Sequence, residues 1–93
     1  MKKVVLFTMK GCPHCQEMKK LLDENHITYD ERDIDKFEDE YNLFVEATDN
    51  EFIPAFMLLT IEDEKPFNVE LLVPDRDFND LNEACVKVKR YLD

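Results

Sequence analysis

Basic side chains are scarce in this chain, whose 93 residues include 12 lysines and arginines against 22 aspartates and glutamates, for a formal net charge of -10. Binding to nucleic acid phosphates requires clustered lysine and arginine, so this balance argues against a nucleic acid partner. No apolar stretch approaches the length of a membrane span, which argues against a membrane protein. The acidity is better explained by solubility and by the choice of protein partners.

The first residues do not resemble a complete secretory signal. The basic pair Lys2-Lys3 precedes only four apolar residues, Val4 to Phe7, whereas a signal peptide has roughly 7 to 15 of them and a small-residue cleavage site. We therefore expect a cytoplasmic protein, in a compartment where thiols stay reduced. A close cysteine pair in such a protein is typical of catalysis or metal binding rather than of a structural disulfide.

Length and composition predict a single folded domain over residues 1–93. A chain of this size has room for one modest core. The hydrophobic fraction of 44%, with seven phenylalanines and three tyrosines, is ample for that core and excludes disorder. No internal repeat, low-complexity segment or linker divides the chain. Any function must therefore depend on one site, and we expect a monomer.

The motif Cys12-Pro13-His14-Cys15 carries the main chemical signal. Pro13 suits the first position of a helix, where its missing N–H costs nothing. Cys12 would then lie at the N-cap, where unpaired backbone N–H groups and the helix dipole favour a thiolate. Lys10 and a protonated His14 would act in the same direction, although His14 equally fits a solvated side chain at a helix start. We predict Cys12 as the nucleophile of thiol-disulfide exchange and the less exposed Cys15 as the resolving thiol.

Two metal-binding interpretations of the cysteine pair stay open. A closed structural zinc site needs four ligands, and after Cys12 and Cys15 only Cys85, His14 and His26 remain, without a second close pair. A zinc site, including one shared between chains, is one alternative. An iron-sulfur cluster held between two subunits is the other alternative. We expect no metal and no bound cofactor.

Two strands and a helix are predicted in the first third of the chain. Residues 3–7 contain an unbroken apolar run, Val4 to Phe7, which is typical of a strand buried on both faces in the middle of a sheet. Residues 13–24 place Met18 and Leu22 with Cys15 on one helical face. Residues 27–32 are more polar and alternate, so they predict a strand nearer the sheet edge. A helix between two strands implies that the strands are parallel.

The next predicted helix covers residues 35–48. Asp35 is followed three residues later by Glu38, the pattern of a capping box at a helix start. Aromatic residues on one side of this helix would face the core. A polar loop, residues 49–51, follows.

A hairpin and a last helix complete the pattern. Residues 55–61 and 67–73 predict two strands joined by a turn over residues 62–66. Apolar residues recur at spacings of three and four from Phe78 to Leu92, which predicts an amphipathic helix. The order β-α-β-α-β-β-α indicates an α/β fold, with a four-stranded mixed sheet flanked by helices on both sides.

The motif Cys12-Pro13-His14-Cys15 after the first strand, together with Phe52-Ile53-Pro54 before the third, resembles the glutaredoxin family of the thioredoxin superfamily. The likeness in element order covers essentially the whole chain, and the motifs themselves cover some ten residues. The resemblance implies a thioredoxin-like fold in which Pro54 is cis and lies against the cysteines, and in which the backbone of Ile53 pairs with the substrate. Without the cysteine motif, a trans proline at a strand start would be the default.

The chain departs from the glutaredoxin pattern where glutathione would bind. Met9 replaces the usual basic residue three positions before the first cysteine, and Lys10 follows one place later. Arg76 and Asp77 stand where a glycine pair is usual, and a glycine there would allow a close backbone approach. Arg76 is a candidate contact to a carboxylate of the tripeptide.

Asn79 and Asp80 match the acidic pair that receives the amino end of glutathione in the family. The resemblance thus implies glutathione contacts from Lys10, Ile53, Pro54, Asn79 and Asp80. His14 stands where glutaredoxins more often have tyrosine. Histidine there is similar to the periplasmic disulfide oxidases, although this chain has neither their length nor a signal peptide.

The remaining cysteine and histidine have simpler interpretations. Cys85 lies on the apolar stripe of the last predicted helix, where a free cysteine commonly behaves as a small buried hydrophobe. Glutathionylation or dimerisation through Cys85 is the alternative. His26 precedes the second strand without an evident partner and is expected to be structural or exposed.

The resemblance implies a dithiol oxidoreductase that reduces protein disulfides or glutathione mixed disulfides, with glutathione as co-substrate. Ribonucleotide reductase is a client suggested by family likeness alone. A thioredoxin-like carrier recharged by a flavoprotein, thioredoxin reductase, is the closest alternative. The others are the zinc or iron-sulfur module and an interaction adaptor that keeps the fold without catalysis.

Overall fold

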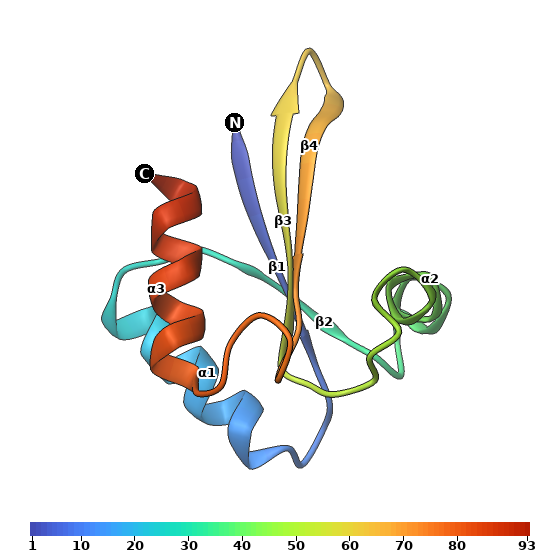
Figure 1. The fold of residues 1–93 in the computed structure, drawn as a ribbon, viewed down its shortest axis with the longest axis vertical. Helices are drawn as coiled ribbons and strands as arrows, with labels where there is room; N and C mark the ends of the chain where they lie inside the picture. The colour runs from blue at the N-terminus through green and yellow to red at the C-terminus, as the bar shows by residue number, and fades with distance from the viewer.

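A four-stranded sheet in the order β2-β1-β3-β4 organises the computed structural model, which describes residues 1–93 (Figure 1). β1 pairs with β2 in parallel and with β3 in antiparallel fashion, and β3 pairs antiparallel with β4. The mixed sheet and the β-α-β-α-β-β-α order expected from the sequence are confirmed. The elements are β1 (Lys2–Thr8), α1 (Pro13–Glu24), β2 (Asp30–Asp33), α2 (Glu38–Thr48), β3 (Ala55–Glu62), β4 (Lys65–Leu72) and α3 (Leu81–Leu92).

The apolar run in β1 is the centre of the sheet. Val4, Val5, Leu6 and Phe7 are all at most 2% exposed. Strands flank β1 on both sides and helices cover both faces of the sheet, so every side chain of the run is buried. Burial of a large apolar side chain stabilises a fold by roughly 1.5–3 kcal/mol, which makes this run a main source of stability.

The helices form a layer on each face of the sheet. In Figure 1, α1 and α3 lie on one side of the strands and α2 lies on the other. Met18 and Leu22 of α1 share a core cluster with Val88 of α3. On the other face, the ring of Phe44 in α2 lies 4.8 Å, between centroids, from the ring of Phe7.

The start of α2 differs from the sequence expectation. The helix begins at Glu38, its N-cap is Phe37, and no side chain caps it. The capping box of Asp35 and Glu38 is therefore wrong. The carboxylate of Asp33 instead accepts a hydrogen bond from the backbone N–H of Asp35 at 2.9 Å, which forms a turn before the helix.

The hairpin is tighter than predicted. Its turn is limited to Asp63 and Glu64, both with positive φ (52° and 66°), as in the two-residue turns that match the twist of a hairpin. Pro66 therefore belongs to β4 and lies opposite Ile61, next to a shift in the register. The second strand is shorter than predicted, since β2 starts at Asp30.

None of the three helices has both the length and the apolar character needed to cross a membrane.

Candidate active site

The turn from β1 into α1 presents the cysteine motif. Gly11, the single glycine, has a φ of +78°, a conformation that side chains rarely adopt, and it makes the turn before Cys12. Cys12 is the N-cap of α1, and Pro13 is at the start of the helix. The Sγ atom of Cys12 accepts a hydrogen bond from the backbone N–H of Cys15 at 3.2 Å. The predicted N-cap position of Cys12 is thus confirmed.

Burial differs between the two sulfurs of the motif. Cys12 is 8% exposed and Cys15 is fully buried, and both are free thiols. Burial, reinforced by the interaction with Cys12, raises the pKa of Cys15 to about 12. Cys15 therefore keeps its proton at neutral pH, behind the more accessible Cys12.

The loop before β3 contains a cis peptide bond between Ile53 and Pro54. The cis geometry expected from the family resemblance is confirmed. Both residues line a cleft that also includes His14, so the loop and the cysteine motif meet at one place although about forty residues separate them in the chain.

This cleft has a volume of about 730 Å³ and lies between α1, the Ile53-Pro54 loop and the segment that joins β4 to α3. Neither cysteine is among its lining residues, but His14 brings it next to the motif. The lining residues are His14, Glu17, Lys20, Leu21, Glu24, Ile53, Pro54, Pro74, Asp75, Phe78, Asn79, Asp80, Leu81 and Asn82.

Five of the residues singled out in the sequence line this cleft: His14, Ile53, Pro54, Asn79 and Asp80, whereas Lys10, Cys12, Pro13 and Cys15 do not. Asn79 and Asp80 lie on its wall with Ile53 and Pro54. Asp80 is also the N-cap of α3, where its Oδ1 atom accepts the backbone N–H of Glu83 at 2.8 Å. Lys10 is exposed on the turn before Cys12 and does not line the cleft.

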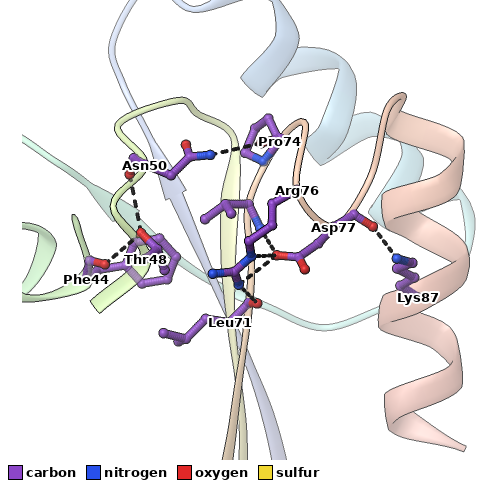
Figure 2. A network of polar contacts seen from close by, with 9 residues as sticks. Phe44, Thr48, Asn50, Leu71, Pro74, Arg76, Asp77 and Lys87 are labelled. Carbon is purple, nitrogen blue, oxygen red and sulfur yellow. Dashed lines mark hydrogen bonds and ion pairs between the residues drawn. The ribbon is translucent and has the colours of Figure 1, made fainter. Parts of the chain in front are cut away.

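Arg76 and Asp77, at the positions of the usual glycine pair, lie within the β4-α3 segment and form a network of polar contacts (Figure 2). The guanidinium of Arg76 donates to the backbone oxygen of Leu71 at 2.9 Å and pairs with Asp77 at 2.8 Å. Asp77 Oδ2 also accepts the backbone N–H of Val73 at 2.8 Å, and Lys87 donates to the Asp77 backbone oxygen. Arg76 is therefore engaged within the chain and lies outside the cleft, away from the glutathione contact suggested for it.

Asn50 is a residue that the sequence interpretation missed. Its side-chain N–H donates to the backbone oxygen of Pro74 at 2.9 Å (Figure 2). Its Oδ1 accepts the backbone N–H of Phe52 at 2.8 Å. It thus links the cis-proline loop to the β4-α3 segment, two walls of the cleft. The only signal for it in the sequence is that asparagine commonly bonds to the backbone in turns.

The other thiol and the second histidine lie outside the cleft. Cys85 is 5% exposed in the core under α3, as expected, and burial raises its pKa. His26 is exposed just after α1. No three histidine, cysteine or carboxylate side chains come together in a way that could hold a metal ion.

Comparison with known proteins adds a family match. The glutaredoxin family model matches residues 4–56, more than half of the chain. A protein named Glutaredoxin 1 from Rickettsia bellii is 33% identical over 36 residues, which is 39% of this chain and 37% of that protein. Glutaredoxin 1 from Rickettsia felis is 35% identical over 37 residues, which is 40% of this chain and 36% of that protein. The matches thus span little more than a third of the length of these relatives.

Solved structures show the same fold over almost the whole chain. The thioredoxin-like protein BC3987 has a TM-score of 0.60 at 20% identity, with 96% of this chain and 99% of that chain covered. Its T8A mutant has a TM-score of 0.61 at 20% identity, with 98% of this chain and 100% of that chain covered. A malarial protein has a TM-score of 0.54 at 17% identity, with 100% of this chain and 99% of that chain covered. The fold is therefore thioredoxin-like.

Proposed function

Because this chain belongs to the glutaredoxin family, we propose that it is a thiol-disulfide oxidoreductase that reduces protein disulfides or glutathione mixed disulfides through Cys12 and Cys15. The observation that carries the proposal is the arrangement of the two sulfurs. Cys12 caps α1 at the rim of the fold, and Cys15 lies one turn later, buried and protonated.

The exchange takes place in two steps. The Cys12 thiolate attacks one sulfur of the substrate disulfide, which forms a mixed disulfide and releases the other substrate sulfur as a thiolate. Cys15 then gives up its proton to a leaving thiolate and attacks the sulfur of Cys12. The bond to the substrate breaks, and the two electrons of the dithiol have passed to the substrate. The protein is left with a Cys12-Cys15 disulfide.

The surroundings of the motif support assigned roles in this exchange. The backbone of Ile53, next to cis Pro54, is proposed to pair with the substrate chain. Lys10, Pro13 and His14 are proposed to stabilise the Cys12 thiolate, together with the N-terminus of α1. Asn79 and Asp80 are proposed to contact the amino end of glutathione when it is the substrate partner.

Turnover of a glutathione mixed disulfide, coupled to glutathione and glutathione reductase, tests the proposal. Cys12→Ser should abolish turnover because the attacking sulfur is lost. Cys15→Ser should keep turnover of the mixed disulfide by a one-thiol route and lose the reduction of protein disulfides. Cys85→Ala is the matched control, since it removes the one thiol outside the cysteine motif, and it should stay active. Full activity of Cys12→Ser would refute the mechanism.

A thioredoxin-like carrier recharged by a flavoprotein reductase is a second candidate. The observation that favours it is the Arg76-Asp77 network, which replaces the glycine pair at which glutathione would approach the backbone. The protein with a Cys12-Cys15 disulfide would then be reduced faster by thioredoxin reductase than by glutathione. Parallel assays with the two electron sources distinguish the candidates.

A further inference from the structure

Carboxylates dominate the cleft beside the cysteine motif. Glu17 and Glu24 project from α1, Asp75 lies between β4 and α3, and Asp80 begins α3. Lys20 is the one lysine or arginine among the lining residues. None of the four carboxylates takes part in an ion pair, so their charges are not neutralised within the protein.

Other positive groups near the cleft do not reverse this balance. The N-terminus of α3 is equivalent to about half a unit of positive charge, and Asp80 already caps it. Lys10 and Arg76 do not line the cleft, and Arg76 is held by Asp77. The cleft is therefore negative at the place where the family resemblance puts the substrate.

We propose that this cleft selects disulfides flanked by lysine or arginine, that is, a basic segment of a partner protein. The inference rests on the proposed function, because the cysteine pair and the Ile53-Pro54 loop define the site and the carboxylates add its selectivity. A cleft lined by charges of one sign concentrates the field and raises the association rate of an oppositely charged partner. Glutathione, with two carboxylates and one ammonium group, has the opposite net charge from the substrate that this cleft favours.

Single-turnover reduction by the pre-reduced protein tests the selectivity without a choice of electron donor. Three model peptides would each carry one cysteine in mixed disulfide with an uncharged thiol, with lysines, serines or glutamates on both sides of the cysteine. Cys12 attacks the disulfide and Cys15 completes the reduction, so the protein supplies both electrons. Dithiothreitol, an uncharged dithiol, measures the intrinsic reactivity of each peptide and corrects for it.

The expected order of rate constants is lysine above serine above glutamate. At low ionic strength the lysine peptide should react about tenfold or more faster than the glutamate peptide, the lower end of the usual range for electrostatic steering. The ratio should fall below about threefold in 0.5 M salt, because screening shortens the reach of the charges.

Two triple variants with the same change in net charge separate the effect of the cleft carboxylates from the effect of the protein's overall acidity. Glu17→Gln, Glu24→Gln and Asp75→Asn together neutralise three cleft carboxylates, and asparagine tolerates the positive φ of 69° at position 75. The control variant carries Glu46→Gln, Glu62→Gln and Glu64→Gln, all exposed and outside the cleft. The cleft variant should lose most of the preference for the lysine peptide, and the control variant should keep it.

The outcomes distinguish a failure of the proposed function from a failure of the selectivity alone. No reduction of any peptide would overturn the proposed function. Equal corrected rates for the three peptides would overturn the selectivity alone. An equal loss of preference in both triple variants would also overturn it, because the net charge of the protein would then explain the effect.

Discussion

Burial distinguishes the two cysteines at the scale of single residues. A helix N-terminus stabilises a nearby negative charge by about 0.3–1 kcal/mol. The pKa of Cys15 rises from 9.0 to about 12, and one pKa unit corresponds to about 1.4 kcal/mol, so the cost of burying a charge outweighs the helix term there. Burial, rather than the helix N-terminus, therefore decides the protonation state of Cys15 one turn inside the helix.

The raised pKa of Cys15 predicts a loss of stability in alkali. Below pH 9 Cys15 is protonated in both the folded and the unfolded chain, and its contribution is fully present. Between pH 9 and 12 the unfolded chain releases this proton and the folded chain retains it, so the free energy of unfolding falls as pH rises. From pH 8 to pH 10.5 the loss attributable to Cys15 should approach about 2 kcal/mol.

Urea unfolding under reducing conditions at the two pH values measures this loss. Cys15→Ser is the comparison, since serine does not titrate in this range, whereas Cys12 and Cys85 are present in both proteins. The wild-type protein should lose more stability between the two pH values than the variant. Equal losses would show that Cys15 is not protected from ionisation by burial.

At the scale of secondary structure, hydrogen bonds from neighbouring elements hold the segment between β4 and α3 in place. Val73 is fully buried, and its backbone N–H is bound by the carboxylate of Asp77. Lys87 of α3 bonds to the backbone of Asp77, and Asn50 bonds to Pro74 from the other side (Figure 2). The wall of the cleft is thus anchored to β4, to α3 and to the cis-proline loop.

Asp77→Ala should lower the free energy of unfolding by about 1–3 kcal/mol, because it leaves a buried backbone N–H without a partner. Arg76→Ala should cost less than about 1 kcal/mol, because the Arg76 side chain is about half exposed and its ion pair is screened by solvent. Urea denaturation of the two variants provides the comparison. An equal or larger cost for Arg76→Ala would mean that the ion pair, rather than the bond to Val73, holds the segment.

Net charge acts at the scale of the whole molecule. With a formal charge of -10 on 93 residues, the folded chain repels itself, and the unfolded chain spreads the same charges over a larger volume. Only four ion pairs offset this repulsion, and all of them include partly exposed side chains. Such pairs contribute little stability individually.

Added salt should therefore stabilise the protein. Screening of the repulsion should raise the free energy of unfolding by on the order of 1 kcal/mol between 0.01 M and 0.5 M sodium chloride, comparable to one close pair of charges in water. Urea titrations at the two salt concentrations measure the change. The variant with Glu46→Gln, Glu62→Gln and Glu64→Gln should respond less because it carries less charge. A fall in stability with salt would show that attractive pairs dominate instead.

Patterns among neighbouring residues made parts of the fold predictable. Competition between neighbouring side chains explains why the predicted capping box is wrong. The bounds of α1 follow from Pro13 and the apolar face of the helix, and the structure agrees with them. The capping box at Asp35 failed because Asp33, two residues earlier, bonds to the Asp35 N–H itself. The hairpin turn was placed too broadly, over residues 62–66, whereas Pro66 belongs to β4, an edge strand that tolerates proline.

The sequence by itself determined the order of the elements and the cysteine motif at a helix start, because these depend on periodicity and capping among neighbouring residues. The cis bond before Pro54 came from the family resemblance, and local propensity favoured trans. Only the tertiary structure decided the bond from Asn50 to Pro74 and the negative cleft. These depend on segments far apart in the chain, and their contacts exist only after the sheet has brought the segments together.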